Sequence, residues 1–155
     1  MIDALYSDKI LALAANMPRA GRLGAPDASA ERVSKLCGSK VTVDVTVQDG
    51  RVVDFAQDVK ACALGQASAA ILGAHVIGAG VAELQLARDA LFAMLKGEGP
   101  APQGRFADLA VLEPVKDYPA RHASTLLAFE AVTAAVREAT LKSPKTARTI
   151  GAVAG

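Results

Sequence analysis

Alternation of valine with polar residues places the strongest constraint on what this chain can fold into. The valines are Val41, Val43, Val45 and Val47, and threonine, aspartate and glutamine fill the positions between and after them. Strict alternation is typical of a β-strand with one buried and one exposed face. A second apolar run, residues 52–55, follows Asp49-Gly50. The two runs therefore predict an antiparallel hairpin.

The length of the turn decides which side chains of this hairpin face each other. A two-residue turn pairs Gln48 with Arg51 and sets Val45 opposite Asp54. A three-residue turn, Asp49-Gly50-Arg51, gives the pairs Gln48–Val52, Val47–Val53, Val45–Phe55 and Val41–Val59. A shift of one residue moves every side chain to the other face, so hydrophobic matching favours the three-residue turn. We expect Gly50 in the left-handed conformation.

The rest of the chain is mainly helical in pattern. Apolar spacing and glycine stops predict helices over residues 3–15, from Ala63 to the glycines at 78 and 80, over 81–96, over 106–112, and from His122 or Ala123 to Lys142.

Together these elements predict an α+β domain. Its small antiparallel sheet is the hairpin, widened by a third strand from residues 28–36, and four or five helices pack against it. Strand and helix do not alternate along the chain, which argues against a doubly wound parallel sheet. We expect one domain over residues 1–142 and a disordered tail over 143–155, where periodicity is absent.

The chain has two cysteines, and they flank the hairpin. Cys37 precedes its first strand and Cys62 follows its second. Because a hairpin brings its open ends together, the two thiols are predicted to be neighbours. Such a pair indicates soft-metal or sulfur chemistry. The alternative, equally open on spacing alone, is that each cysteine is a small buried hydrophobe.

Two helix N-termini add further groups to this candidate site. Cys62 is expected at the start of the helix from Ala63, where backbone amides stabilise a thiolate. Residues 118–124 lead into the last helix and supply a guanidinium, an imidazole and a hydroxyl: Arg121, His122 and Ser124. His122 is either a ligand or a helix-capping residue. Arg121 either pairs with a partner's carboxylate or a sulfur anion, or is solvated. His75 and Asp54 are expected to be structural.

Composition excludes several functional classes. The net charge is +1 and no basic run is interleaved with aromatic residues, so neither nucleic acid nor an anionic membrane is expected as a partner. Without a bilayer-length apolar run or a signal peptide, the chain is predicted to be cytoplasmic, where thiols stay reduced. Hydrolase triads, phosphate-binding glycine loops and His-Glu-x-x-His zinc motifs are not found.

Several short motifs, in order, carry a resemblance to a known family. They are Tyr6-Ser7-Asp8-Lys9-Ile10-Leu11, Asn16-Met17-Pro18-Arg19, Cys37-Gly38-Ser39, Gly50-Arg51-Val52-Val53-Asp54, Cys62 followed by Ala67-Ser68, and Pro119-Ala120-Arg121 leading into Leu127-Ala128. This series resembles the iron–sulfur cluster scaffold family of the IscU, SufU and NifU N-terminal type. The long interval between Cys62 and the last helix is similar to the SufU branch. The resemblance implies a small antiparallel sheet covered by helices, with a metal site at one end.

The resemblance also implies a ligand set, from which this chain departs. Cys37 and Cys62 match the family's first two cysteines. Ser39 stands where the family has an aspartate and Ser124 where it has a third cysteine, while Ala61 replaces a glycine. An alcohol stays protonated at neutral pH and is a poor ligand for zinc or iron. One chain therefore offers Cys37, Cys62 and, at most, His122, against the four donors of a zinc or cluster site.

Three functions follow from the resemblance. In the first, the chain is a scaffold or carrier that holds iron or a [2Fe–2S] cluster through Cys37 and Cys62, with a partner or second subunit completing the ligands. In the second, it is a SufU-like sulfurtransferase in which Cys62 accepts persulfide sulfur, with zinc loosely held. In the third, it is a ligand-degenerate regulator. Only the second is an enzyme. The implied partners are a cysteine desulfurase, other assembly proteins and, for a shared cluster, a second copy of the chain.

Overall fold

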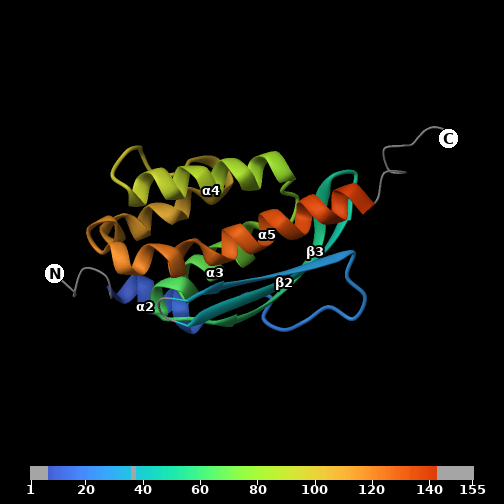
Figure 1. Cartoon of the computed structure of the whole chain (residues 1–155), viewed down its shortest axis with the longest axis horizontal. Coiled ribbons are helices and arrows are strands. Elements are labelled where there is room, and N and C mark those ends of the chain that lie inside the picture. The colour runs from blue at the N-terminus through green and yellow to red at the C-terminus, as the bar shows by residue number, and fades with distance from the viewer. Residues whose placement is uncertain (1–6, 36–37, 143–155) are drawn as a thin grey trace.

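The computed structural model describes residues 7–35 and 38–142 and contains one antiparallel sheet of three strands. The strands are β1 (Ala28–Ser34), β2 (Ser39–Gln48) and β3 (Arg51–Lys60), in the order β1-β2-β3. Helices cover one face of this sheet (Figure 1). The predicted α+β class and the third strand within residues 28–36 are confirmed. The predicted tail over 143–155 lies outside the described residues.

The hairpin turn is shorter than the sequence predicted. Gln48 pairs with Arg51, so only Asp49 and Gly50 lie between β2 and β3. Both residues have positive φ, 52° and 76°, as in the type I′ turns that match the right-handed twist of the strands. The prediction of a left-handed Gly50 is confirmed. The three-residue turn was wrong because Asp49 also tolerates the left-handed region, which aspartate does more readily than most residues.

A bulge restores the hydrophobic register that the shorter turn would have shifted. Two of the predicted pairs are present: Val45–Phe55 and Val41–Val59. The register changes between Thr46 and Val47, where Val47 pairs with Val52 instead of Val53. Val53 is thus the extra residue of β3, and its side chain is exposed. One inserted residue in the strand compensates for the residue missing from the turn.

The described chain also contains four α-helices and two 3₁₀ segments. They are α2 (Asp8–Ala15), α3 (Ala63–His75), α4 (Val81–Leu95), η1 (Gly104–Asp117), η2 (Pro119–Arg121) and α5 (His122–Lys142). The predicted starts at residues 63, 81 and 122 are confirmed. The first predicted helix is confirmed over α2, where Ser7 Oγ accepts the Ile10 N–H at 3.3 Å as an N-cap, while residues 3–6 lie outside the described chain.

The segment predicted as a short helix over 106–112 is a longer run of 3₁₀ turns. Phe106 departs from helical φ/ψ, and Pro114 lies inside the segment. Proline has no N–H to donate and clashes with the preceding turn of an α-helix, so tight 3₁₀ turns take the place of a regular helix.

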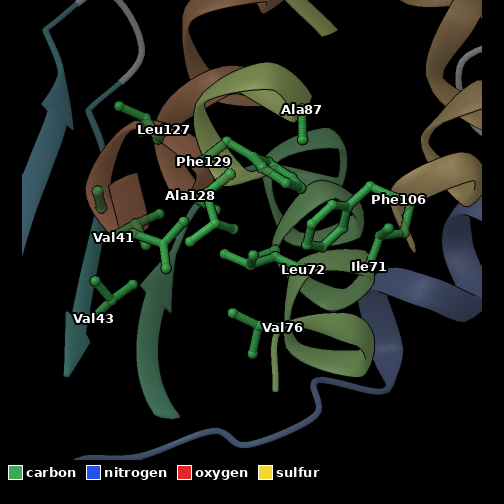
Figure 2. Close-up of a cluster of buried hydrophobic side chains, with 14 of the residues drawn as sticks. Val41, Val43, Ile71, Leu72, Val76, Ala87, Phe106, Leu127, Ala128 and Phe129 are labelled. Atoms are coloured by element: carbon green, nitrogen blue, oxygen red, sulfur yellow. The ribbon is translucent and has the colours of Figure 1, made fainter. Parts of the chain in front are cut away.

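The core lies between the valine face of the sheet and the helices (Figure 2). Val41, Val43 and Val45 are fully buried, and α5 packs against both β1 and β2. Phe106 and Phe129 meet edge to face, with ring centroids 5.3 Å apart, the preferred geometry of an aromatic pair. No helix in the described part of the chain has the length and apolar character to span a bilayer.

A buried carboxylate holds the loop before β1 on the outer face of the sheet. The Asp44 side chain is fully buried. Arg22 donates to it from Nε and Nη2 at 2.6 and 3.0 Å, Ser29 Oγ donates at 2.5 Å, and the Leu23 N–H donates at 3.0 Å. The Arg22 hydrogen bonds, against opposing desolvation and with help from Ser29, lower the pKa of Asp44 to about 2. These charge-assisted bonds fix the path of the loop.

We expect Asp44→Asn to lower the free energy of unfolding at pH 7 by about 2 kcal/mol, because the amide cannot replace a carboxylate that accepts two bonds from Arg22. The pKa of Asp44 is about 2 in the folded protein against an ordinary 3.8. Its contribution is therefore present above about pH 4 and is lost as the pH falls towards about 2. Urea unfolding across this range should show a steeper loss of stability in the wild type than in the variant.

Asp54→Asn is the matched control for this prediction. The Asp54 side chain is 55% exposed and lies 3.9 Å from Arg19, so its replacement should change the free energy of unfolding by less than about 0.5 kcal/mol. Equal losses in the two variants would contradict a special role for Asp44.

Candidate functional site

The candidate site lies at the end of the sheet where β2 begins and β3 ends. Lys40 pairs with Lys60, so Ser39, the first residue of β2, lies at the same end as Cys62, two residues beyond β3. The hairpin thus brings together the two chain segments that the sequence singled out. Cys37 itself lies outside the described residues, and its predicted proximity to Cys62 stays a prediction.

Cys62 contacts Ser124, the position at which the resemblance implies a third cysteine. It is half-buried and is the N-cap residue of α3, with extended backbone at φ −68° and ψ 171°. Its Sγ lies 3.4 Å from the Oγ of Ser124 in the first turn of α5. The predicted convergence of the segment at residue 62 with residues 118–124 is confirmed for this pair of side chains.

The Ser124 hydroxyl has a second partner that defines its role in the contact. It donates to the Arg121 carbonyl at 3.2 Å, and Thr125 Oγ1 donates to the same carbonyl at 2.7 Å. With its proton directed at Arg121, Ser124 Oγ can accept the Cys62 S–H. Because Thr125 also satisfies the carbonyl, Ser124 can instead turn its proton towards a Cys62 thiolate.

A glycine in α3 permits this close approach of two helix N-termini. A Cβ added at Gly65 would lie 3.1 Å from the Ser124 carbonyl oxygen and 2.8 Å from the Cβ of Ala61. Any larger residue would push α3 away from the start of α5, and Cys62 with it. The sequence analysis missed Gly65 and Thr125; a glycine inside a helix, one turn after a candidate ligand, was the available signal.

The separation of Cys62 and Ser124 matches that of two ligands of one metal ion. Bonds of about 2.3 Å to sulfur and 2.0 Å to oxygen in a tetrahedral site place the two donor atoms about 3.5 Å apart. The observed 3.4 Å is close to this separation and is also the length of a hydrogen bond between a thiol and a hydroxyl, so a ligand role for this pair stays a prediction. A protonated alcohol does not replace a thiolate, so the described donors do not fit a resident zinc ion.

His122 is held by a contact with η1. It is buried, and its Nε2 lies 2.9 Å from the Val115 carbonyl. A carbonyl only accepts, so Nε2 carries a proton in this contact, and in the neutral imidazole Nδ1 is then the nitrogen with the lone pair. Nδ1 is buried and has no hydrogen-bond partner. Within residues 7–35 and 38–142, no three His, Cys, Asp or Glu side chains are grouped to hold a metal ion. The role of His122 as a ligand stays a prediction.

The other residues singled out in the sequence, Ser39, Arg121 and His75, lie in three different environments. Ser39 is buried and pairs with Ser34 at the end of the sheet, on the central strand β2. Arg121 is half-buried at the end of η2, and its carbonyl organises the two hydroxyls described above. His75 contacts Asp108 at 3.1 Å and meets the Phe106 ring edge on, which fits its expected structural role.

Comparison with known proteins gives consistent matches over most of the chain. The family described as the NifU-like N terminal domain matches residues 5–125. The iron–sulfur cluster assembly scaffold protein IscU of Thermotoga maritima is 28% identical over 134 residues, which cover 86% of this chain and 94% of that protein.

Two crystal structures are similar in fold. A nitrogen-fixing NifU-like protein (N-terminal) from Brucella abortus has a TM-score of 0.88 and 56% identity, covering 92% of this chain and 99% of that one. A protein from Fervidobacterium islandicum AW-1, described as a cluster assembly scaffold for the SUF system, has a TM-score of 0.79 and 22% identity, covering 86% and 98%. At that identity the second match shows the fold alone.

We expect Ser124→Cys to restore metal binding at this position. The variant places a second sulfur next to Cys62 Sγ, and its zinc affinity should rise by at least about tenfold. Competition with a chromophoric zinc chelator under reducing conditions measures this change. Ser124→Ala is the control because it removes the hydroxyl without adding a thiol. Equal zinc affinities of the two variants would show that residue 124 does not point into a ligand position.

Proposed function

Because the chain belongs to the NifU-like N-terminal domain family of iron–sulfur cluster assembly scaffolds, we propose that it holds iron or a [2Fe–2S] cluster as transient cargo through Cys62 and Cys37. The observation that carries this proposal is the contact between Cys62 Sγ and Ser124 Oγ at 3.4 Å. It supports a site in which helix N-termini and a sheet end still converge as a ligand cluster requires.

The donor set favours cargo that is shared between chains. A [2Fe–2S] centre takes four thiolates, and one chain has two cysteines. Two copies facing each other would supply four. Cys62 is half-buried and packs against the core, and the proposal requires its sulfur to be reached by a second chain. Ser124 and Ser39 would then border the cluster without coordinating it, and the unpaired Nδ1 of His122 is the remaining proposed donor.

The sulfur of such a cluster has to be delivered by another protein. A cysteine desulfurase is the partner we propose, since it forms a protein persulfide from cysteine. Arg121, at the end of η2, is the proposed contact for a carboxylate or sulfur anion of that partner.

Anaerobic reconstitution with ferrous iron and sulfide tests the scaffold function. We expect a coloured dimer with one [2Fe–2S] cluster for two chains, measured by visible absorption, iron analysis and light scattering. Cys62→Ser keeps the size of the side chain but removes the thiolate, so it should lose the cluster, as should Cys37→Ser. Asp54→Asn, an exposed change on β3, should reconstitute like the wild type.

A colourless, metal-free monomer would contradict the proposal. If replacement of both cysteines by alanine also left the cellular phenotype intact, the result would favour the regulatory function over the scaffold.

A second candidate function is favoured by the environment of Cys62 alone. Cys62 is a partly buried residue at a helix N-terminus, and its sulfur touches a hydroxyl that can donate to an anion. In this function the Cys62 thiolate attacks the outer sulfur of a protein persulfide. A new S–S bond forms on Cys62, the donor's S–S bond breaks, and its electron pair leaves with the donor cysteine as a thiolate. No metal takes part.

Mass spectrometry after incubation with a cysteine desulfurase, its pyridoxal phosphate cofactor and cysteine tests this transfer. We expect Cys62 to gain one sulfur atom in metal-free buffer with chelator present. Ser124→Ala should shorten the lifetime of the persulfide, because the anion loses its hydrogen-bond donor. Cys37→Ser is the control and should leave the Cys62 modification unchanged. If both thiols remain unmodified, the transfer function fails.

A further inference from the structure

A groove lies along α5, C-terminal to Ser124. This groove of about 390 Å³ is bordered by residues of β1, α4 and α5. The lining residues are Arg32, Gln85, Arg88, Glu130, Thr133, Ala134 and Arg137. We call it the arginine groove, because three guanidinium groups from three different elements surround it.

The floor of the arginine groove is a stripe of α5. Glu130, Thr133, Ala134 and Arg137 follow the i, i+3, i+4, i+7 spacing of one helix face. The Thr133 hydroxyl is turned away, donating to the Phe129 carbonyl at 2.7 Å, and Ala134 is small. The floor between the charged walls is therefore low and gives space for a main chain to lie along the helix.

A chain of hydrogen bonds positions two of the three arginines. Arg137 Nη2 donates to Gln85 Oε1 at 2.9 Å, and Gln85 Nε2 donates to Asp89 Oδ1 at 3.0 Å. Arg88 donates to the same Asp89 oxygen and to Glu130 Oε2, both at 3.2 Å. Because both guanidinium groups are held in place beforehand, a ligand loses less side-chain entropy on binding them.

Two of the arginines retain unused donors. Among residues 7–35 and 38–142, the Arg32 side chain makes one hydrogen bond, to the carbonyl of Glu31 at 2.9 Å, and the Glu31 carboxylate instead faces Lys40 and Thr42. Within the same residues, the Arg137 side chain makes one hydrogen bond, to the neutral amide of Gln85. Each guanidinium has five N–H donors in a planar fork that matches a carboxylate. The groove thus has positive charge that the described residues leave partly unmatched.

From this arrangement we infer that the arginine groove is a docking surface for an extended acidic segment of a partner protein. Three arginines and one glutamate line it, so the lining has an excess of positive charge on a chain whose net charge is +1. Aspartate or glutamate side chains pair with Arg32 and Arg137, and the partner's main chain lies over Ala134. The existing Arg88–Glu130 pair restricts binding to a segment that places its carboxylates at the two free arginines.

The arginine groove and the candidate site both include residues of α5. Ala134 and Ser124 lie on the same helix, about 15 Å apart along its axis at 1.5 Å per residue. The groove and the candidate site therefore share α5 as their common support. Docking does not require that Cys62 carries iron or sulfur, so the inference stands or falls independently of the proposed function.

Fluorescence anisotropy with a labelled hexaglutamate peptide tests the inference on the full chain at low ionic strength. We expect salt-sensitive binding that the double variant Arg32→Gln/Arg137→Gln weakens by about fivefold, the size of two partly exposed ion pairs. Arg51→Gln is a single-charge control. It removes one positive charge, against two in the double variant, from the exposed hairpin end of β3, where Arg51 donates to the Gly78 carbonyl, and should change the affinity by less than about twofold.

Amide chemical shifts of ¹⁵N-labelled protein locate the bound peptide. Perturbations within residues 85–89 and 130–137 would support the groove. Three outcomes would overturn the inference: equal binding of hexaglutamine, equal weakening by Arg51→Gln, or perturbations centred on the sheet end near Lys40 and Lys60. Salt-sensitive self-association that the double variant abolishes, without peptide binding, would assign the surface to a second copy of this chain and would also overturn it.

Discussion

Burial of the valine face of β2 beneath α5 is the interaction on which the remaining structure depends. Val41, Val43 and Val45 are fully buried, and α5 packs against β1, β2, α3 and α4. Helix α5 therefore covers the core, and this packing fixes where the two ends of α5 lie. Its first turn brings Ser124 to Cys62, and its second half forms the floor of the arginine groove. A core of small aliphatic side chains leaves little room for α5 to shift without loss of packing.

In the candidate site, the distance between Cys62 and Ser124 and the chemical nature of the two side chains point in different directions. The 3.4 Å between Cys62 Sγ and Ser124 Oγ would suit two ligands of one metal ion and equally suits a hydrogen bond, and one of the two atoms is an alcohol oxygen. Under the proposed function, the replacement of a thiolate by an alcohol lowers the affinity of a single chain for iron or a cluster. Cargo that needs donors from a second chain is bound only while both chains are present, and it is free to leave when they separate. Weak binding by one chain thus suits transfer better than storage.

The sequence predicted the architecture well because local patterns agreed with the fold. Valine alternation, the glycine stops and the start of the helix at Ala63 each point to an element that the structure contains. The turn was predicted wrongly because hydrophobic matching was applied as if the strands had no bulge. In the structure Val53 is an extra, unpaired residue of β3, and it restores the register that the shorter turn shifts. Two features depended on contacts distant in sequence and had no local pattern: the fit of Gly65 against the backbone of Ser124, and the burial of Asp44 by Arg22 and Ser29.

The pairing of a tight turn with a bulge has a consequence for how this hairpin can change in evolution. The turn contains two residues and β3 contains one extra residue, Val53. An insertion in the turn alone, or a deletion at Val53 alone, would rotate the strand and expose its apolar side chains. The two changes made together would cancel, leaving Phe55 and Val59 opposite the same partners. Length variation among related hairpins should therefore occur as coupled gains and losses at these two positions, so that the end of the sheet bearing Cys62 keeps its alignment.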